Sequence, residues 1–150
     1  MTYEELKAKM DDCHYIYDET LATILYVSLQ LGRPLLIEGA AGVGKTEVAK
    51  VMASALGRDL VRLQCYEGLD ESKALYEWNY QKQLLSIQVN RNTLDSDTLT
   101  KSLFSDEYLL ERPLLKSIRA EKPVVLLIDE IDKADEGFEA FLLELLSEQQ

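Results

Sequence analysis

One eight-residue stretch constrains this chain more than any other part of it. Residues 39–46 read GAAGVGKT, which matches the pattern G-x-x-x-x-G-K-[ST]. The glycines at positions 39, 42 and 44 permit tight turns with positive φ, which direct successive backbone N–H groups inward. A helix that begins directly after such a loop adds the positive end of its dipole. The stretch is therefore predicted to be a loop that binds phosphate groups.

Backbone and side chains of this loop have different expected roles. Lys45 adds a mobile positive charge for β and γ phosphates. Thr46 places a hydroxyl where Mg²⁺ would bind, because that ion takes few protein ligands and fills its other positions with phosphate oxygens and water. The residues predicted to bind the nucleotide are Gly39, Ala40, Ala41, Gly42, Val43, Gly44, Lys45, Thr46 and Glu47.

The sequence on either side of the loop agrees with this interpretation. Residues 34–38 (PLLIE) form a short apolar run typical of a buried parallel strand. After the loop, apolar residues recur at helical spacing, and Gly57 can end that helix. A simple glycine-rich turn, the alternative interpretation, requires neither a strand before it nor a helix after it.

A second chemical element follows about eighty residues later. Residues 124–128 (VVLLI) predict a fully buried strand, and Asp129 and Glu130 follow at its C-terminal end. Open α/β sheets place their functional residues at that end. Asp129 can share a Mg²⁺ shell with Thr46, and Glu130 is placed to polarise an attacking water molecule. The alternative interpretation is that the two acidic residues are simply the solvated end of a strand. Their position about eighty residues after the phosphate loop favours a catalytic site.

Bulk properties exclude several classes of protein. The 150 residues suit one domain, and 47% hydrophobic with 29% charged residues is typical of a soluble globular chain. A net charge of -11 argues against a nucleic-acid-binding face. No apolar run is long enough to span a membrane, and the N-terminus lacks a secretory signal, so a cytoplasmic location is expected. Cys13 and Cys65 are expected to be reduced structural thiols.

The remaining pattern predicts the other elements. Polar residues 90–100 are expected to form a mobile linker. Pro113 is expected either to kink a helix over 106–120 or to begin a new helix. Hydrophobic periodicity predicts helices over 3–10, 18–31, 72–89 and 131–147 and a strand over 60–65.

Several aromatic residues have two possible roles. Residues 13–17 (CHYIY) either line an adenine pocket or pack in the core, and His14 is expected to be a surface or packing residue. Aromatic residues at the spacing of Tyr66, Tyr76 and Tyr80 are usually part of a core. Leu75, Trp78 and Leu85 are the expected buried residues of the helix over 72–89.

These motifs resemble a known family. GAAGVGKT and VVLLIDE are similar to the Walker A and Walker B elements of AAA+ ATPases. The wider sequence resembles the MoxR branch in residues 15–19, 33–39, 63–70 and 111–115. The resemblance implies a P-loop NTPase fold, an α/β three-layer sandwich with a mainly parallel sheet. It also implies a homo-hexamer that uses ATP and Mg²⁺ to remodel a client protein.

The resemblance assigns roles to particular residues. Lys45 would bind the β and γ phosphates, Thr46 and Asp129 would serve Mg²⁺, and Glu130 would activate water. Gln64 is a candidate for the polar residue that restrains the catalytic glutamate in many AAA+ proteins. The segment between the second strand and the Walker B strand is similar in placement to the helix-2 insert of the MoxR branch, although its hairpin has no residue assignment.

The resemblance covers only part of an AAA+ module. Residues 1–33 correspond to N-terminal helices and residues 34–150 to the nucleotide-binding core. The family carries its sensor 1 strand, arginine finger and helical lid beyond the position of Gln150. The sensor 1 strand normally lies between the P-loop and Walker B strands, so those two are expected to share no sheet unless they pair directly. The chain is therefore expected to be a fragment that turns over ATP slowly by itself.

Two other functions remain open at this point. A small-molecule P-loop kinase would need a mobile lid rich in arginine, whereas the arginines here are scattered. The adjacent Asp129 and Glu130 also favour water activation. The second alternative is a nonenzymatic interaction module that binds nucleotide as a structural switch or does not bind it.

Overall fold

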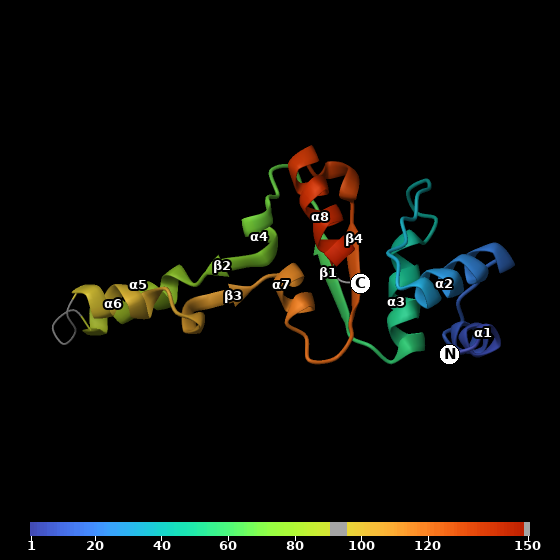
Figure 1. Cartoon of the computed structure of the whole chain (residues 1–150), viewed down its shortest axis with the longest axis horizontal. Coiled ribbons are helices and arrows are strands. Elements are labelled where there is room, and N and C mark those ends of the chain that lie inside the picture. Colours follow the sequence, from blue (N-terminus) through green and yellow to red (C-terminus); the bar gives the residue numbers. More distant parts are fainter. Residues whose placement is uncertain (91–95, 149–150) are drawn as a thin grey trace.

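The computed structural model describes residues 1–90 and 96–148. They form an elongated α/β structure around a two-stranded parallel sheet (Figure 1). Three helices lie on one side of this sheet, and an arm extends from the other side (Figure 1). The three helices are α1 (Tyr3–Asp12), α2 (Glu19–Leu31) and α3 (Lys45–Leu56). The predicted α/β class with a parallel sheet is confirmed.

The first two helices begin and end where local side-chain chemistry directs. Thr2 and Glu5 form a capping box at the start of α1. Asp18 accepts a hydrogen bond from the backbone N–H of Leu21 at the start of α2, and Gly32 ends that helix in the left-handed conformation. Apolar side chains of all three helices form one cluster, whose buried members are Leu6, Met10, Leu25, Val48, Val51 and Met52.

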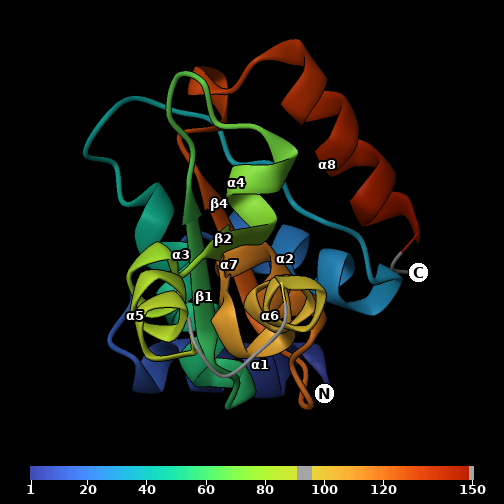
Figure 2. The same cartoon turned by 90° about the vertical axis from the view of Figure 1, so that its left-hand side faces the viewer.

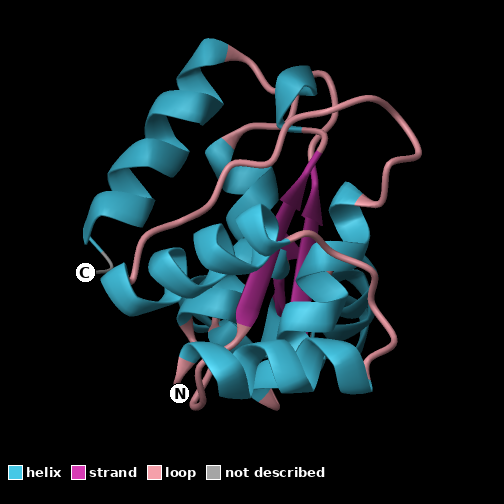
Figure 3. Cartoon of the chain, turned by 90° about the vertical axis from the view of Figure 1, so that its right-hand side faces the viewer, coloured by secondary structure: helices cyan, strands magenta, loops and turns pink. Residues whose placement is uncertain are grey.

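The central sheet joins two distant segments. Strand β1 (Leu60–Gln64) pairs in parallel with β4 (Val125–Asp129), with Gln64 opposite Asp129. In β1, side chains alternate between the buried and exposed faces, so Arg62 and Gln64 lie on the same exposed face. Figure 3, viewed from the side of α1 to α3, shows the sheet among the surrounding helices.

Two expectations about this sheet are wrong. Residues 34–38 form no strand, and Leu36 is 69% exposed. Strand β4 is half-buried along its whole length rather than fully buried. Residues 34–38 pair with no strand among the described residues, and β4 pairs there with β1 alone, which leaves its other edge unpaired. The P-loop segment and the Walker B strand therefore share no sheet, as the sequence led us to expect.

The predicted helix over 72–89 is also wrong. The chain instead forms α4 (Glu71–Leu75), β2 (Tyr76–Trp78) and α5 (Tyr80–Asn90). Strand β2 pairs antiparallel with β3 (Leu109–Glu111), and this pairing interrupts the helix. The two strands form the base of the arm, while α5 and α6 (Ser96–Leu103) lie side by side at its far end (Figures 1 and 2).

The predicted linker over 90–100 lies partly outside the described residues, and its described part from Ser96 onward belongs to α6. The prediction of a linker is therefore wrong for residues 96–100, because polar residues there form one side of an amphipathic helix over residues 96–103. A short 3₁₀ turn, η1 (Asp106–Tyr108), leads into β3. Pro113 then begins α7 (Pro113–Ile118), so the second alternative for this proline is correct.

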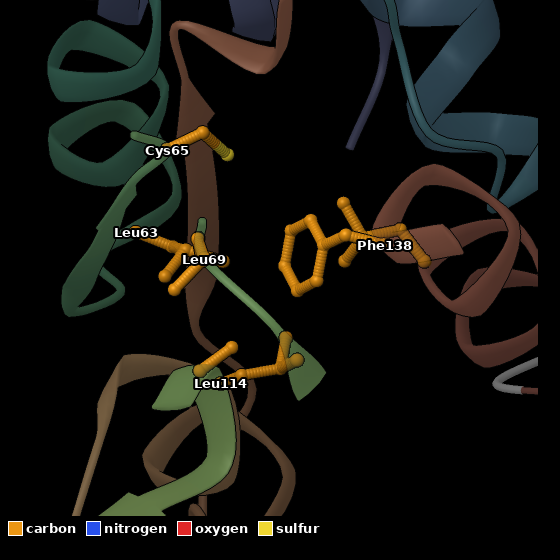
Figure 4. Packing of buried hydrophobic residues seen from close by; sticks show 7 residues of the cluster. Leu63, Cys65, Leu69, Leu114 and Phe138 are labelled. Carbon is orange, nitrogen blue, oxygen red and sulfur yellow. The ribbon is translucent and has the colours of Figure 1, made fainter. Parts of the chain in front are cut away.

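The last helix is shorter than expected. Residues 131–147 divide into the 3₁₀ turn η2 (Ile131–Lys133) and α8 (Glu136–Glu148). Asp135 causes the division, because its carboxylate accepts a hydrogen bond from the backbone N–H of Phe138 at 2.8 Å and starts a new helix there. Phe138 points into a second buried cluster (Figure 4), which comprises Leu63, Cys65, Leu69, Ala74, Leu114, Phe138 and Leu142.

Several aromatic and apolar residues are more exposed than expected. Tyr66, Tyr76 and Tyr80 are 45%, 38% and 64% exposed, so none belongs to a core. Leu85 is 62% exposed on α5, whereas Trp78 is half-buried between Tyr76 and Phe104. Cys13 and Cys65 are free thiols, as expected. In the described part of the chain, no helix is sufficiently long and apolar to cross a membrane.

Candidate active site

The phosphate loop has the backbone geometry that its glycines predict. Gly42 and Gly44 have φ values of 81° and 88°, in a region that L side chains rarely adopt. Gly44 precedes the first residue of α3, and no side chain caps that helix. No side chain therefore competes with an anion for the positive end of the helix, although the backbone N–H of Glu47 donates to the carbonyl oxygen of Gly44 at 3.0 Å.

Lys45 folds back over the loop. Its Nζ donates hydrogen bonds of 2.6 Å to the backbone carbonyl oxygens of Gly39 and Ala40. A Cβ atom added to Gly39 would lie 3.4 Å from Val43 Cγ2 and 3.9 Å from Lys45 Cδ. A side chain at residue 39 would therefore contact Val43 and the aliphatic part of Lys45.

The structure brings the loop and the acidic strand end together. Thr46 Oγ1 lies 3.4 Å from Asp129 Oδ2, although the two residues are 83 positions apart in the chain. Packing of α3 against β4 produces this contact. The distance is long for a hydrogen bond between two oxygen atoms. Neighbouring oxygens in an octahedral Mg²⁺ shell lie about 3 Å apart, since each Mg–O bond is about 2.1 Å.

Asp129 has two further partners. Its Oδ1 accepts a hydrogen bond of 3.1 Å from the backbone N–H of Glu130. Its Oδ2 accepts a hydrogen bond of 2.7 Å from Arg62 Nη2 in an ion pair. Sequence reasoning did not identify Arg62. The alternation of β1 carried the signal, because it places Arg62 on the same face as Gln64, near the end of β4.

Glu130 is held in an unusual conformation. Its φ is 56° and its ψ is 43°, which is left-handed backbone that a residue with a side chain adopts at a cost of about 1–2 kcal/mol. Its carboxylate forms an ion pair with Lys133, a residue that the sequence analysis did not single out. The hydrogen bond from Lys133, followed by one from Gln64, lowers the pKa of Glu130. Gln64 lies opposite Asp129 in the sheet, next in sequence to the glutamate that it was expected to restrain.

The donor atoms at this site fit Mg²⁺ bound together with a nucleotide. Thr46 and Asp129 supply two oxygen atoms, the ligand type that Mg²⁺ prefers. Such a site matches an ion that takes most of its ligands from phosphate and water.

The aromatic segment before α2 lies beside the cluster of α1 to α3. Tyr15 and Tyr17 stack with ring centroids 6.4 Å apart and pack against that cluster, whereas Ile16 is 94% exposed. Burial and the nearby charge of Glu47 raise the pKa of Tyr15. Tyr15 and Tyr17 therefore pack against the core, which is one of the two roles expected for residues 13–17. His14 is exposed, as expected of a surface residue. Two hollows border residues 116–124 near the start of β4, and neither is lined by a residue of the phosphate loop.

Comparisons with known proteins agree with this geometry. The family model of the AAA domain (dynein-related subfamily) matches residues 34–150. The chain is 30% identical to the Lon protease of Halothermothrix orenii over 162 aligned residues, which include 98% of this chain. The chain spans only 17% of the length of that protease. No solved structure matches the chain.

Proposed function

Because the chain belongs to the AAA domain family, in its dynein-related subfamily, we propose that the loop over 39–47 and the end of β4 form its site for ATP binding and hydrolysis. Family membership supports ATP binding and hydrolysis in general. The observation that carries the assignment to these residues is the 3.4 Å approach of Thr46 Oγ1 to Asp129 Oδ2. It unites the phosphate loop and the acidic strand end in one place.

Each residue of the proposed site has a role that follows from its position. The loop amides and the start of α3 bind the phosphates. The ammonium group of Lys45, which contacts loop carbonyls here, would turn to the β and γ phosphates when nucleotide binds. Thr46 and Asp129 would hold Mg²⁺. When bound, this ion supplies charge neutralisation on the phosphates.

Glu130 would accept a proton from the attacking water molecule. The lowered pKa keeps its carboxylate ionised, as a proton acceptor must be. The ion pair with Lys133 directs the carboxylate in the protein without nucleotide. The ion pair with Lys133 must open before Glu130 can take a proton, because the pairing lowers its basicity.

The wider role that we propose is remodelling of a client protein by a MoxR-type hexamer in the cytoplasm. The sequence resemblance across the chain supports this role, as does the arm between β1 and β4, whose position in the sequence is similar to that of a helix-2 insert. This arm exposes apolar side chains that a client could contact, namely Tyr80, Leu84, Leu85 and Phe104. An arginine finger from a neighbouring subunit would then raise the slow turnover expected of the chain alone.

The test compares ATP binding and hydrolysis in three variants. We expect Lys45→Ala to weaken binding by at least about tenfold, which is about 1.4 kcal/mol. Lys50→Ala is the matched control, because this lysine lies on the same helix, is exposed and pairs with the Glu47 side chain, whereas Lys45 contacts the backbone carbonyls of Gly39 and Ala40. Glu130→Gln should keep ATP binding and lose hydrolysis, measured in a longer chain that includes the rest of the AAA+ module.

The alternatives predict other outcomes. A nonenzymatic interaction module would bind equally well with and without Lys45, or would not bind ATP. A small-molecule kinase would transfer phosphate to an acceptor faster than to water. Rapid ATP turnover by residues 1–150 alone would contradict the need for a neighbouring subunit.

A further inference from the structure

We propose that Arg62 is a positioning residue that competes with Mg²⁺ for Asp129, and that this competition sets how strongly nucleotide binding depends on the metal. The inference rests on the proposed function, since it concerns the same site. It adds a residue that neither the Walker motifs nor the family match assigns.

The competition follows from which oxygen Arg62 contacts. Arg62 Nη2 lies 2.7 Å from Asp129 Oδ2, and the Thr46 hydroxyl lies 3.4 Å from that same atom. The other carboxylate oxygen, Oδ1, already accepts the backbone N–H of Glu130. The guanidinium group therefore holds the oxygen that faces Thr46, which is the oxygen that a cation shared with Thr46 would use.

The surroundings of Arg62 permit it to move away. Its side chain is 50% exposed, whereas that of Asp129 is 20% exposed. Asp129 is the one ion-pair partner of Arg62 among the described residues. An exposed arginine with a single carboxylate partner can turn toward solvent at small cost, while Asp129 is fixed by the backbone of β4.

Charge determines the sign of the effect. A guanidinium group and a divalent cation repel each other when both contact one carboxylate. Arg62 must therefore leave Asp129 when the metal binds, which weakens metal binding. Without metal, Arg62 neutralises Asp129 and reduces its repulsion of the phosphates. Both effects reduce the coupling between metal and nucleotide, a free energy that each ligand exerts on the other equally.

The experiment measures the affinity of the full chain for a fluorescent ATP analogue in EDTA and in saturating Mg²⁺. The readout is the dissociation constant in EDTA divided by the dissociation constant in Mg²⁺ for the same variant. A general loss of folded protein affects both constants and cancels in this ratio. We expect Arg62→Gln to raise this ratio by at least about tenfold, with weaker binding in EDTA and tighter binding in Mg²⁺. Arg62→Lys, which keeps the charge, should have an intermediate ratio.

The control is Arg119→Gln. Arg119 forms an ion pair of 3.0 Å with Glu111, has a 48% exposed side chain and is remote from the loop. This variant should have the wild-type ratio. An unchanged ratio in Arg62→Gln would overturn the inference, because Arg62 would then be only structural.

A lower ratio in Arg62→Gln, with weaker binding in Mg²⁺, would also overturn the inference, since Arg62 would then contact the phosphates. In both of these cases the proposed nucleotide site would stand, because the wild type binds the analogue. No binding by the wild type in either solution would overturn both the inference and the proposed function.

Discussion

Substitution of two adjacent leucines on α8, Leu142 and Leu143, tests which face of this helix is buried. Leu142 is 3% exposed and belongs to the cluster around Phe138, whereas Leu143 is 70% exposed. The same substitution, Leu→Ala, therefore removes the same atoms from the core at one position and from the surface at the next. Because α8 follows the turn that holds Glu130, its packing also supports the candidate active site.

The expected difference is large. Removing a buried leucine side chain costs about 2–5 kcal/mol, through lost transfer free energy and the cavity that remains. For a chain of this length each kcal/mol lowers the melting temperature by about 2–4 °C. A loss of about 3 kcal/mol in Leu142→Ala thus corresponds to a fall of about 6–12 °C. Leu143→Ala should change the free energy of unfolding by no more than about 0.5 kcal/mol.

Urea unfolding followed by far-ultraviolet circular dichroism measures both variants under one condition. A lower midpoint at constant slope would show that Leu142→Ala changed stability and not the unfolded state. If Leu143→Ala proved as destabilising as Leu142→Ala, the assignment of the buried face of α8 would be wrong.

Three further predictions concern the loop, the thiols and the N-terminal helices. Gly42→Ala should cost about 1–2 kcal/mol from backbone strain alone, since φ is 81° and nothing lies within 4 Å of the added Cβ; Gly137→Ala, in a helix, should cost nothing by the same urea assay. Iodoacetamide should alkylate half-buried Cys13 more than about tenfold faster than Cys65, whose thiol is buried and has a raised pKa for that reason; equal rates would contradict the burial. Hydrogen bonds from Lys7 and Tyr3 lower the pKa of Glu19, so its stabilisation is present at pH 7 and is lost as the pH falls through this lowered pKa; Glu19→Gln should therefore lower the urea midpoint more at pH 7 than in acid.

Local signals in the sequence predicted the residues of the site. The three loop glycines, the helix that starts at Lys45 and the apolar run before Asp129 each depend on neighbours in the chain. Packing of α3 against β4 brings Thr46 to Asp129, a contact that the order of the two motifs along the chain favours. For this reason the main contact of the site could be anticipated.

Pairings between distant segments could not be anticipated in the same way. Residues 76–78 have a sequence compatible with a helix, and only their pairing with residues 109–111 makes them a strand. The exposed positions of Tyr76 and Tyr80 follow from that change of element. Residues 34–38 show the opposite case, an apolar run that pairs with no strand among the described residues.

The partners of the two acidic residues were equally hidden. Lys133 lies three residues after Glu130, within reach only because the left-handed turn at Glu130 brings η2 back toward it. Arg62 comes from the neighbouring strand, so its contact with Asp129 depends on the register of β1 and β4. Motifs define which residue types a reaction needs, but the register decides which charges surround them.

The central claim is that the phosphate loop and the end of β4 form a single site for nucleotide and metal. The most direct measurement is a double-mutant cycle of Thr46→Ala and Asp129→Asn, read as the Mg²⁺-dependent part of the affinity for an ATP analogue. If both side chains act through one bound ion, each variant alone should lose most of that dependence, and the double variant should lose no more than the worse single variant. Losses that simply add in free energy would contradict the claim, because they would show two independent sites.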